Sequence, residues 1–233
     1  MLTLDEILVK LQDIEKMGYV KTHRVKDTGI GKTLEDLIGI QENNFPSSNG
    51  HKIELKSGRK DKTSMVSLFT KSPLPRGSNT KILQEYGYLS DNGRNKLEVN
   101  LSSKTFNLIK GTPRIKTNVT ETGIELVDTH GKVSGSWPNE ILKRFIERKL
   151  PEVLYVKANS KGSGENEMFW YNEAWVLSGL DFDTFLRMVS EDNIIVNIRI
   201  GQYPNGKTHD HGTGFRVLPS KLELCFKNRR RVL

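Results

Sequence analysis

The sequence has few cysteines and no long apolar run, and each shortage excludes a class of protein. Its 233 residues include a single cysteine, Cys225, which leaves no internal disulfide and no multi-cysteine zinc site. No segment approaches the roughly 20 apolar residues that a membrane-spanning helix needs, and the acidic, amphipathic N-terminus is unlike a signal peptide. We therefore expect a cytoplasmic protein without membrane contact, stabilised by the packing of its core.

Acidic residues are fewer than basic ones. The chain carries 36 Lys and Arg residues against 28 Asp and Glu residues, which gives a formal net charge of +8. Clustered cations gain affinity for nucleic acid by releasing phosphate counterions, although many basic proteins only have a solvated basic surface. Hydrophobic residues make up 35% and charged residues 27%, as in an ordinary globular protein, and the length suits one compact unit. Composition alone leaves a nucleic-acid partner open.

Apolar periodicity predicts several helices in a mixed α/β fold. Thr3 and Glu6 form a capping-box pattern ahead of apolar residues at helical spacing, which predicts an N-terminal helix. Thr33 is predicted to cap a second, short helix that carries Glu35. Two later helices are predicted to begin at Ser136 to Pro138 and to span Phe182 to Val189.

Alternating residues predict strands between these helices. In GHKIELKS, which follows a turn-rich stretch, Glu54 and Lys56 lie on the face opposite to two apolar side chains. Short alternating runs broken by turn residues predict a β-rich section over residues 86–135. In IIVNIRIGQY the same alternation points Arg199 away from the core, where it is available for binding.

Glu54 and Lys56 supply what phosphodiester hydrolysis requires. The reaction needs a divalent cation held by carboxylates and a positive group near the attacking water or the charged transition state. Mg²⁺ near Glu54 could also take the Leu55 carbonyl, because this hard cation prefers oxygen ligands, and Glu35 is the candidate supporting carboxylate. A solvated strand face carries the same Glu-x-Lys pattern in many proteins and is the alternative.

Four segments are longer and more unusual than this tripeptide. TGIGKTLEDL, IELK, LFTKSP followed by PRG, and RIGQYPNGKTHDHGTGFRV resemble the MvaI/BcnI group of restriction endonucleases, which is related to the mismatch-repair nicking enzyme MutH. The resemblance runs in order over nearly the whole chain. It implies a PD-(D/E)xK nuclease core, with a central mixed β-sheet flanked by helices. The implied MutH-like unit, residues 1–233, has two lobes around a DNA cleft: a catalytic lobe that includes 1–85 and a recognition lobe that includes 190–220.

One catalytic position departs from the family pattern. The resemblance makes Glu54 the metal carboxylate, Lys56 the motif lysine and Glu35 the helix carboxylate. The pattern also places an aspartate, a further metal ligand, five residues before the glutamate, where this sequence has Asn49. An amide is a neutral ligand that holds a cation more weakly, so we expect strongly impaired cleavage. The otherwise intact motif favours an engineered Asp→Asn change over a natural one, whereas without the family Asn49 would merely suit a turn before Gly50.

The resemblance also assigns contacts with double-stranded DNA. It implies base contacts by Arg199, His209, Asp210, His211 and Arg216, with Tyr203 as a weaker candidate. Arginine suits the O6 and N7 atoms of guanine, and aspartate can accept from the cytosine amino group. Lys71 and Arg76, in a Pro/Gly loop, are expected to contact phosphates, with a solvated loop as the alternative. The two histidines also fit a metal site or a solvated polar hairpin.

The sequence therefore predicts a type II restriction endonuclease. Its HDHG segment matches the MvaI type, whereas the BcnI type carries arginine at the second histidine, which favours CCWGG (W is A or T) over CCSGG. The resemblance implies a monomer that nicks the two strands in sequence with Mg²⁺, alongside a cognate DNA methyltransferase. One alternative is a MutH-like nicking enzyme at methylation-controlled GATC sites. Another is an inactive, sequence-specific DNA-binding protein in which Asn49 is native.

Overall fold

The computed structural model describes residues 2–40, 44–46, 52–61 and 64–233, and its contacts divide the chain into two compact units. Unit 1 consists of residues 1–66, 146–181 and 218–233, and unit 2 consists of residues 67–145 and 182–217. Both units are thus assembled from segments that are distant in sequence. Residues 67–85 group with unit 2, together with the predicted base-contacting segment.

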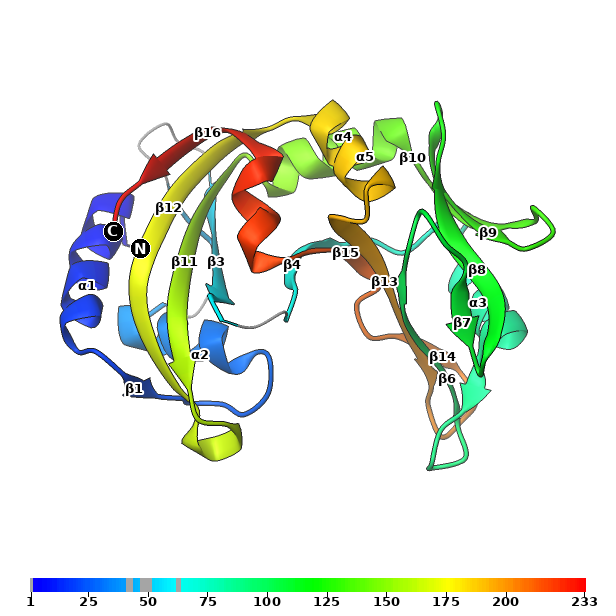
Figure 1. The fold of residues 1–233 in the computed structure, drawn as a ribbon, viewed down its shortest axis with the longest axis horizontal. Helices are drawn as coiled ribbons and strands as arrows, with labels where there is room; N and C mark the ends of the chain where they lie inside the picture. Colours follow the sequence, from blue (N-terminus) through cyan, green and yellow to red (C-terminus); the bar gives the residue numbers. More distant parts are fainter. Residues whose placement is uncertain (1, 41–43, 47–51, 62–63) are drawn as a thin grey trace. The chain divides into compact units, whose positions relative to one another are not determined.

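Unit 1 is built on a six-stranded mixed sheet (Figure 1). The strand order is β1-β12-β11-β3-β2, and β16 also pairs with β12. β3 runs parallel to β11, while the other pairs are antiparallel. The elements of this unit are α1 (Leu4–Lys16), β1 (Val20–Lys21), α2 (Gly29–Ile38), β2 (Asn44–Pro46), β3 (Lys52–Arg59), β11 (Glu152–Lys161), η1 (Gly164–Asn166), β12 (Met168–Leu180), η2 (Pro219–Cys225) and β16 (Phe226–Arg231).

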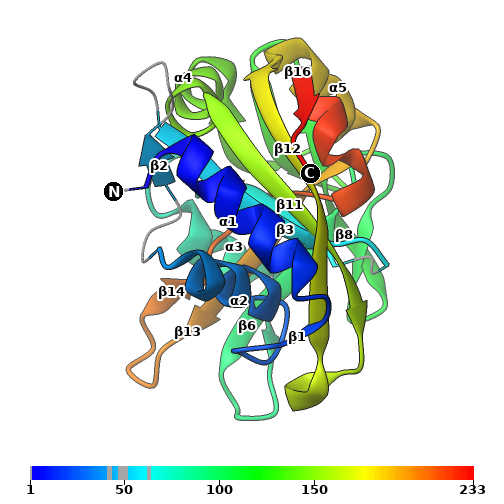
Figure 2. The same cartoon turned by 90° about the vertical axis from the view of Figure 1, so that its left-hand side faces the viewer.

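Helices α1 and α2 lie across one face of this sheet, as Figure 2 shows. Their apolar stripes and the apolar side chains of β3, β11 and β12 form one buried core. Burying each such leucine or isoleucine contributes about 1.5–3 kcal/mol relative to exposure. The largest contributors from the helices are fully buried: Ile7, Leu11, Leu34 and Ile38.

The two N-terminal helices begin differently. The capping box of α1 is confirmed: Thr3 caps the helix, and its backbone N–H donates to Glu6 Oε2 at 2.7 Å. The predicted start of α2 is wrong, because Thr33 lies inside a helix that begins at Gly29. The Thr33 hydroxyl is fully buried and accepts from the backbone N–H of His23 at 2.9 Å. The hydroxyl thus accepts a hydrogen bond from the preceding loop instead of capping the helix.

Unit 2 contains two sheets. The first has the order β4-β15-β13-β6-β5, with β14 also paired to β13, and the second has the order β10-β9-β8-β7. Its elements are β4 (Val66–Thr70), which begins at the last residue of unit 1, α3 (Ser78–Tyr86), β5 (Tyr88–Leu89), β6 (Asn95–Leu101), β7 (Asn107–Ile109), β8 (Thr112–Val119), β9 (Gly123–Asp128), β10 (Val133–Pro138), α5 (Phe182–Ser190), β13 (Ile194–Gln202), β14 (Thr208–Asp210) and β15 (Gly214–Val217). Helix α4 (Asn139–Lys149) contains the boundary between residues 145 and 146.

Aromatic packing dominates the core of unit 2. The Phe215 ring centroid lies 4.9 Å from Phe69, 5.3 Å from Phe185 and 5.7 Å from Trp137. Tilted and edge-on pairs of this kind add about 0.5–1.5 kcal/mol each beyond the area they bury. The cluster fixes β4, β15, α5 and β10 against one another.

The predicted mixed α+β class with a central mixed sheet is confirmed, as are the β-rich section and the helix at Phe182. The helix start at Ser136 to Pro138 is wrong, because both residues continue β10. Ser136 pairs with Glu125 and Pro138 with Gly123, so α4 begins only at Asn139.

No helix in the described ranges is both long and apolar enough to cross a membrane.

Candidate active site and nucleic-acid interface

Strand β3 places Glu54 and Lys56 on one face of the sheet of unit 1. The alternate residues Ile53 and Leu55 are 0% and 6% exposed and pack in the core on the other face. Lys56 Nζ donates to Glu54 Oε1 at 2.5 Å, with the two side chains only 9% and 21% exposed. A short, charge-assisted hydrogen bond therefore fixes a carboxylate and an ammonium group side by side.

Glu35 lies on α2, which covers the opposite face of β3. The Glu35 carboxylate and the Ser57 hydroxyl both lie close to Gly31. A Cβ atom added at Gly31 would be 3.6 Å from Ser57 Oγ and 4.0 Å from Glu35 Oε1. Burial raises the pKa of Glu35, and the nearby Lys32 only partly offsets this. Among described atoms, no hydrogen bond or ion pair joins Glu35 to the Glu54–Lys56 pair. Its catalytic role stays a prediction.

The oxygen donors on β3 match a hard divalent cation in type. They are the Glu54 carboxylate and the Leu55 carbonyl, and Asn49, the other predicted ligand, lies outside the described residues. Within the described ranges, no three His, Cys, Asp or Glu side chains converge on a possible metal position. The donors therefore fit Mg²⁺ chemically, and further ligands must come from elsewhere.

Arg199 and Arg216 lie on the polar face of the first sheet of unit 2. On β13, apolar residues alternate with Arg199, as predicted, and the guanidinium Nε lies 3.8 Å from Glu98 Oε1 on neighbouring β6. Arg216 on β15 is in register with Ile195, which shares the Arg199 face of β13. Arg199 is 39% exposed, so its guanidinium is accessible to a ligand.

Tyr203, His209 and His211 form a cluster of rings at the β13–β14 hairpin. The Tyr203 hydroxyl and His209 Nδ1 are 2.6 Å apart, and their rings are 4.5 Å apart. The His211 ring lies edge-on to His209, with centroids 4.2 Å apart. These three side chains and the 90–96 hairpin line a cavity of about 530 Å³. The contacts within this ring cluster fix the orientation of the rings, which hydrogen-bonded recognition of a ligand requires.

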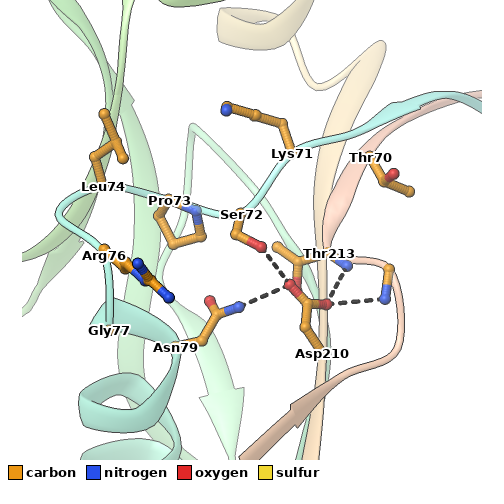
Figure 3. Close-up of a pocket in the computed structure, with 11 residues that line it drawn as sticks. Thr70, Lys71, Ser72, Pro73, Leu74, Arg76, Gly77, Asn79, Asp210 and Thr213 are labelled. Carbon is orange, nitrogen blue, oxygen red and sulfur yellow. Dashed lines mark hydrogen bonds between the residues drawn. The ribbon is translucent and has the colours of Figure 1, made fainter.

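The Asp210 carboxylate is surrounded by donors (Figure 3). Its Oδ2 accepts from Ser72 Oγ at 2.6 Å and from Asn79 Nδ2 at 2.7 Å. Its Oδ1 accepts from the backbone N–H groups of Gly212 and Thr213 at 2.8 and 2.6 Å. Burial alone would raise the pKa of Asp210, but these hydrogen bonds outweigh it and lower the pKa. All four lone-pair positions are used, so the carboxylate ties β14 and its loop to the 72–79 segment.

Lys71 and Arg76 line a cavity of about 570 Å³ that Asp210 also lines. The backbone at Lys71 is held on both sides, because its N–H donates to Thr213 and its carbonyl accepts from the Trp137 indole. Lys71 Nζ lies 5.7 Å from the centroid of the Phe145 ring. Both residues therefore border the cavity that Asp210 also lines, and their phosphate role stays a prediction.

Sequence reasoning missed Ser72 and Asn79, which hold Asp210 in place. Both lie within the predicted Pro/Gly loop, in which only the two cations were assigned a role. The hydrogen bonds join residues that are 138 and 131 positions apart, and no local spacing rule reveals such pairs. Glu98, the neighbour of Arg199, was missed for the same reason.

Comparisons with known proteins identify relatives. The model of the MvaI/BcnI restriction endonuclease family matches residues 8–226. A solved restriction endonuclease MvaI–cognate DNA substrate complex is 31% identical, with a TM-score of 0.82 over 99% of this chain and 98% of that chain. Restriction endonuclease MvaI in the absence of DNA is 29% identical, with a TM-score of 0.60 over 99% and 97%. No curated protein matches.

Proposed function

Because the chain belongs to the MvaI/BcnI restriction endonuclease family, and so is a nuclease that acts on DNA, we propose that it is a type II enzyme specific for CCWGG. The observation that carries the cleavage chemistry of this proposal is the Glu54–Lys56 pair, a carboxylate and an ammonium group held 2.5 Å apart on one strand face, whereas the assignment of CCWGG rests on the HDHG segment. A charged pair on a solvated strand would be more exposed, whereas these side chains are 21% and 9% exposed.

The residues of β3 divide the chemistry between them. The Glu54 carboxylate and the Leu55 carbonyl would hold Mg²⁺, which, when bound, polarises the scissile phosphate and activates water. Lys56 carries a positive charge to the position where negative charge develops on the phosphate. Its ion pair with Glu54 fixes the ammonium group before the DNA arrives, so little reorganisation is needed. Glu35 remains a candidate supporting carboxylate from α2.

Asn49 is the weak point of this site. A carboxylate at position 49 would add a negative ligand, whereas the amide supplies only a neutral oxygen. Cleavage by this chain, with Asn49, is therefore strongly impaired. A sequence-specific DNA-binding protein without nuclease activity is the second candidate function, and Asn49 is the observation that favours it. The intact remainder of the motif favours an engineered Asp→Asn change.

Recognition of duplex DNA is assigned to the polar face of unit 2. Arg199 and Arg216 suit bidentate contacts to guanine, and His209 and His211 are oriented by their edge-on contact. The HDHG segment favours A or T at the central position. The solved relative with cognate DNA supports a double-stranded substrate. We assign a monomer that nicks the strands in sequence, with a cognate DNA methyltransferase as its counterpart.

The test compares three proteins, the parent chain with Asn49 and the variants Asn49→Asp and Asn49→Ala. Each is incubated with supercoiled plasmids that carry one CCWGG or one CCSGG site. Asn49→Asp is expected to nick and then linearise the CCWGG plasmid with Mg²⁺ and to leave the CCSGG plasmid intact. Asn49→Ala is expected to remain inactive. Equal activity of all three chains would refute the metal-ligand role of position 49, and no activity with specific binding would favour the second candidate.

A further inference from the structure

Strand β11 carries a buried tyrosine beside the candidate catalytic pair. In its parallel register with β3, Tyr155 lies opposite Lys56 and Val153 lies opposite Glu54, so these side chains share a face. Tyr155 is 0% exposed. Its ring lies directly against Gly58, where an added Cβ would come within 3.2 Å of Tyr155 Cζ. The ring therefore fills the space beside the strand that carries Lys56.

The hydroxyl of Tyr155 reaches the segment through which the chain re-enters unit 1. It donates to the Pro219 carbonyl at 3.2 Å. Pro219 is the first residue of η2, only two residues after the end of β15 at Val217. Arg216 on β15, a proposed guanine contact, is three residues before Pro219. The hydrogen bond thus attaches the sheet that carries Lys56 to the direct continuation of a recognition strand.

A second attachment holds η2 to the same sheet face. Lys157, two residues after Tyr155 on β11, forms an ion pair with Glu223 of η2. The Lys157 ammonium group also pairs with Glu173 at 3.1 Å and lies 5.6 Å from the Tyr155 ring centroid. The side chains of Lys157 and Glu223 are both 14% exposed. Two contacts in succession therefore keep η2 from moving independently of β11.

We propose that Tyr155 is a positioning residue that couples DNA recognition to cleavage. Its hydroxyl holds Pro219 against the sheet, so that a displacement of β15 on DNA reaches β3 at Lys56. This inference rests on the proposed function, because it takes Lys56 as catalytic and Arg216 as a DNA contact. Burial raises the pKa of Tyr155, so the hydroxyl stays protonated and remains a donor at neutral pH.

The chain offers a matched control in Tyr171. This tyrosine is also 0% exposed, and its hydroxyl also donates to a backbone carbonyl, that of Ile30, at 2.7 Å. It lies in unit 1 on β12, but its ring packs in the core on the α1 and α2 face. Tyr171→Phe therefore removes the same kind of hydrogen bond without touching η2.

Both Phe substitutions are made in the active Asn49→Asp chain. Tyr155→Phe is expected to lower single-turnover cleavage of a CCWGG duplex about 5- to 10-fold, the upper range for one lost hydrogen bond. Its dissociation constant for the uncleaved duplex in Ca²⁺ is expected to stay within about twofold. Tyr171→Phe is expected to lose similar thermal stability while keeping the cleavage rate. An unchanged rate in Tyr155→Phe, or an equal loss in both variants, would overturn the inference.

A second readout does not depend on cleavage. If Asn49→Asp is inactive, that result counts against the proposed function and not against the coupling. The coupling is then tested by amide hydrogen exchange in the parent chain, which carries Asn49. Addition of CCWGG duplex is expected to slow exchange over Ile53–Arg59 in the parent and in Tyr171→Phe, but not in Tyr155→Phe. Equal protection in all three chains, or no protection in the parent, would overturn the inference.

Discussion

Two carboxylates in the molecule have opposite surroundings, although the sequence assigned both to function. Within the described part of the chain, the charged partner of Glu54 in unit 1 is Lys56, at 2.5 Å. Asp210 in unit 2 accepts four hydrogen bonds, two on each oxygen. Glu54 therefore keeps lone pairs for a cation, whereas Asp210 has already used its own.

The difference separates a site that is ready for a ligand from a site that holds a loop. A carboxylate accepts up to about four hydrogen bonds, so a further ligand at Asp210 would have to displace a donor. At Glu54, Lys56 is the one partner among the described residues with which an incoming cation competes. We infer that Asp210 serves recognition by ordering the loop between β14 and β15, and a base contact by this residue requires Ser72 or Asn79 to move.

The largest expected effect is at Lys56. In the Asn49→Asp chain, Lys56→Ala should lower the cleavage rate about 10²- to 10⁴-fold, because a positive charge is lost where negative charge develops. Binding of CCWGG duplex in Ca²⁺ should remain close to the parent value. Quench-flow cleavage and a filter-binding titration measure the two quantities. A variant that binds poorly but cleaves at the parent rate when saturated would place Lys56 in binding instead.

The next effect tests the saturated carboxylate. Asp210→Asn replaces an accepting oxygen with an amide NH₂ that faces donors, so it should lower the free energy of unfolding by about 2 kcal/mol. Specific DNA binding should weaken at the same time, because the loop is no longer held. Thermal unfolding and a competition titration with CCWGG duplex give the two values.

Asp192 provides the control for this change. It also holds a loop of unit 2, since its carboxylate accepts from Ser102 Oγ at 2.6 Å and from the Ser103 N–H at 2.5 Å. Asp192→Asn should cost similar stability and leave CCWGG binding unchanged. If Asp210→Asn weakened binding at full stability, Asp210 would be a direct base reader.

A smaller effect distinguishes cations that read bases from those that hold phosphates. Arg199→Ala and Arg216→Ala should each remove about 1–3 kcal/mol of discrimination between CCWGG and a mutated site. Lys71→Ala should weaken binding to all duplexes alike and reduce its salt dependence, because a phosphate contact carries no sequence information. Competition titrations at two salt concentrations measure both quantities. Equal discrimination in all three variants would contradict the assignment.

Local patterns explain which parts of the fold were predictable. The N-terminal helix and the alternation on β3 depend on neighbouring residues, and both were predicted correctly. The start of α2 was wrong because the Thr33 hydroxyl bonds to His23, whose position depends on the tertiary fold. Strand β12, the partner of β11, was not predicted. Its mixture of polar and aromatic residues shows no regular alternation, and it favours a strand only when packed against neighbouring strands.

The same limit applies to the functional site. Spacing along β3 predicted that Glu54 and Lys56 share a face, because alternation fixes side-chain direction. It gave no sign that Ser72 and Asn79 would occupy Asp210, because those contacts join segments more than a hundred positions apart. Tyr155 was missed as well, since its contact with Gly58 arises only from the parallel pairing of β3 and β11.

The smallest expected effect concerns a third carboxylate, Glu173, which accepts several hydrogen bonds, as Asp210 does, but lies in the sheet of Glu54. Burial would raise its pKa, but hydrogen bonds from Lys60, Trp175 and Lys157 lower it from 4.5 to about 2. A folded-state pKa below the unfolded value stabilises the fold above pH 4.5, and this contribution disappears as the pH falls towards 2. Urea unfolding followed by tryptophan fluorescence should therefore show the parent more stable than Glu173→Gln at pH 7. The gap should shrink as the pH falls from 5 towards 2, because the unfolded parent chain takes up a proton at Glu173 before the folded chain does, whereas glutamine does not titrate. A gap independent of pH would mean that the glutamine loses packing and not charge.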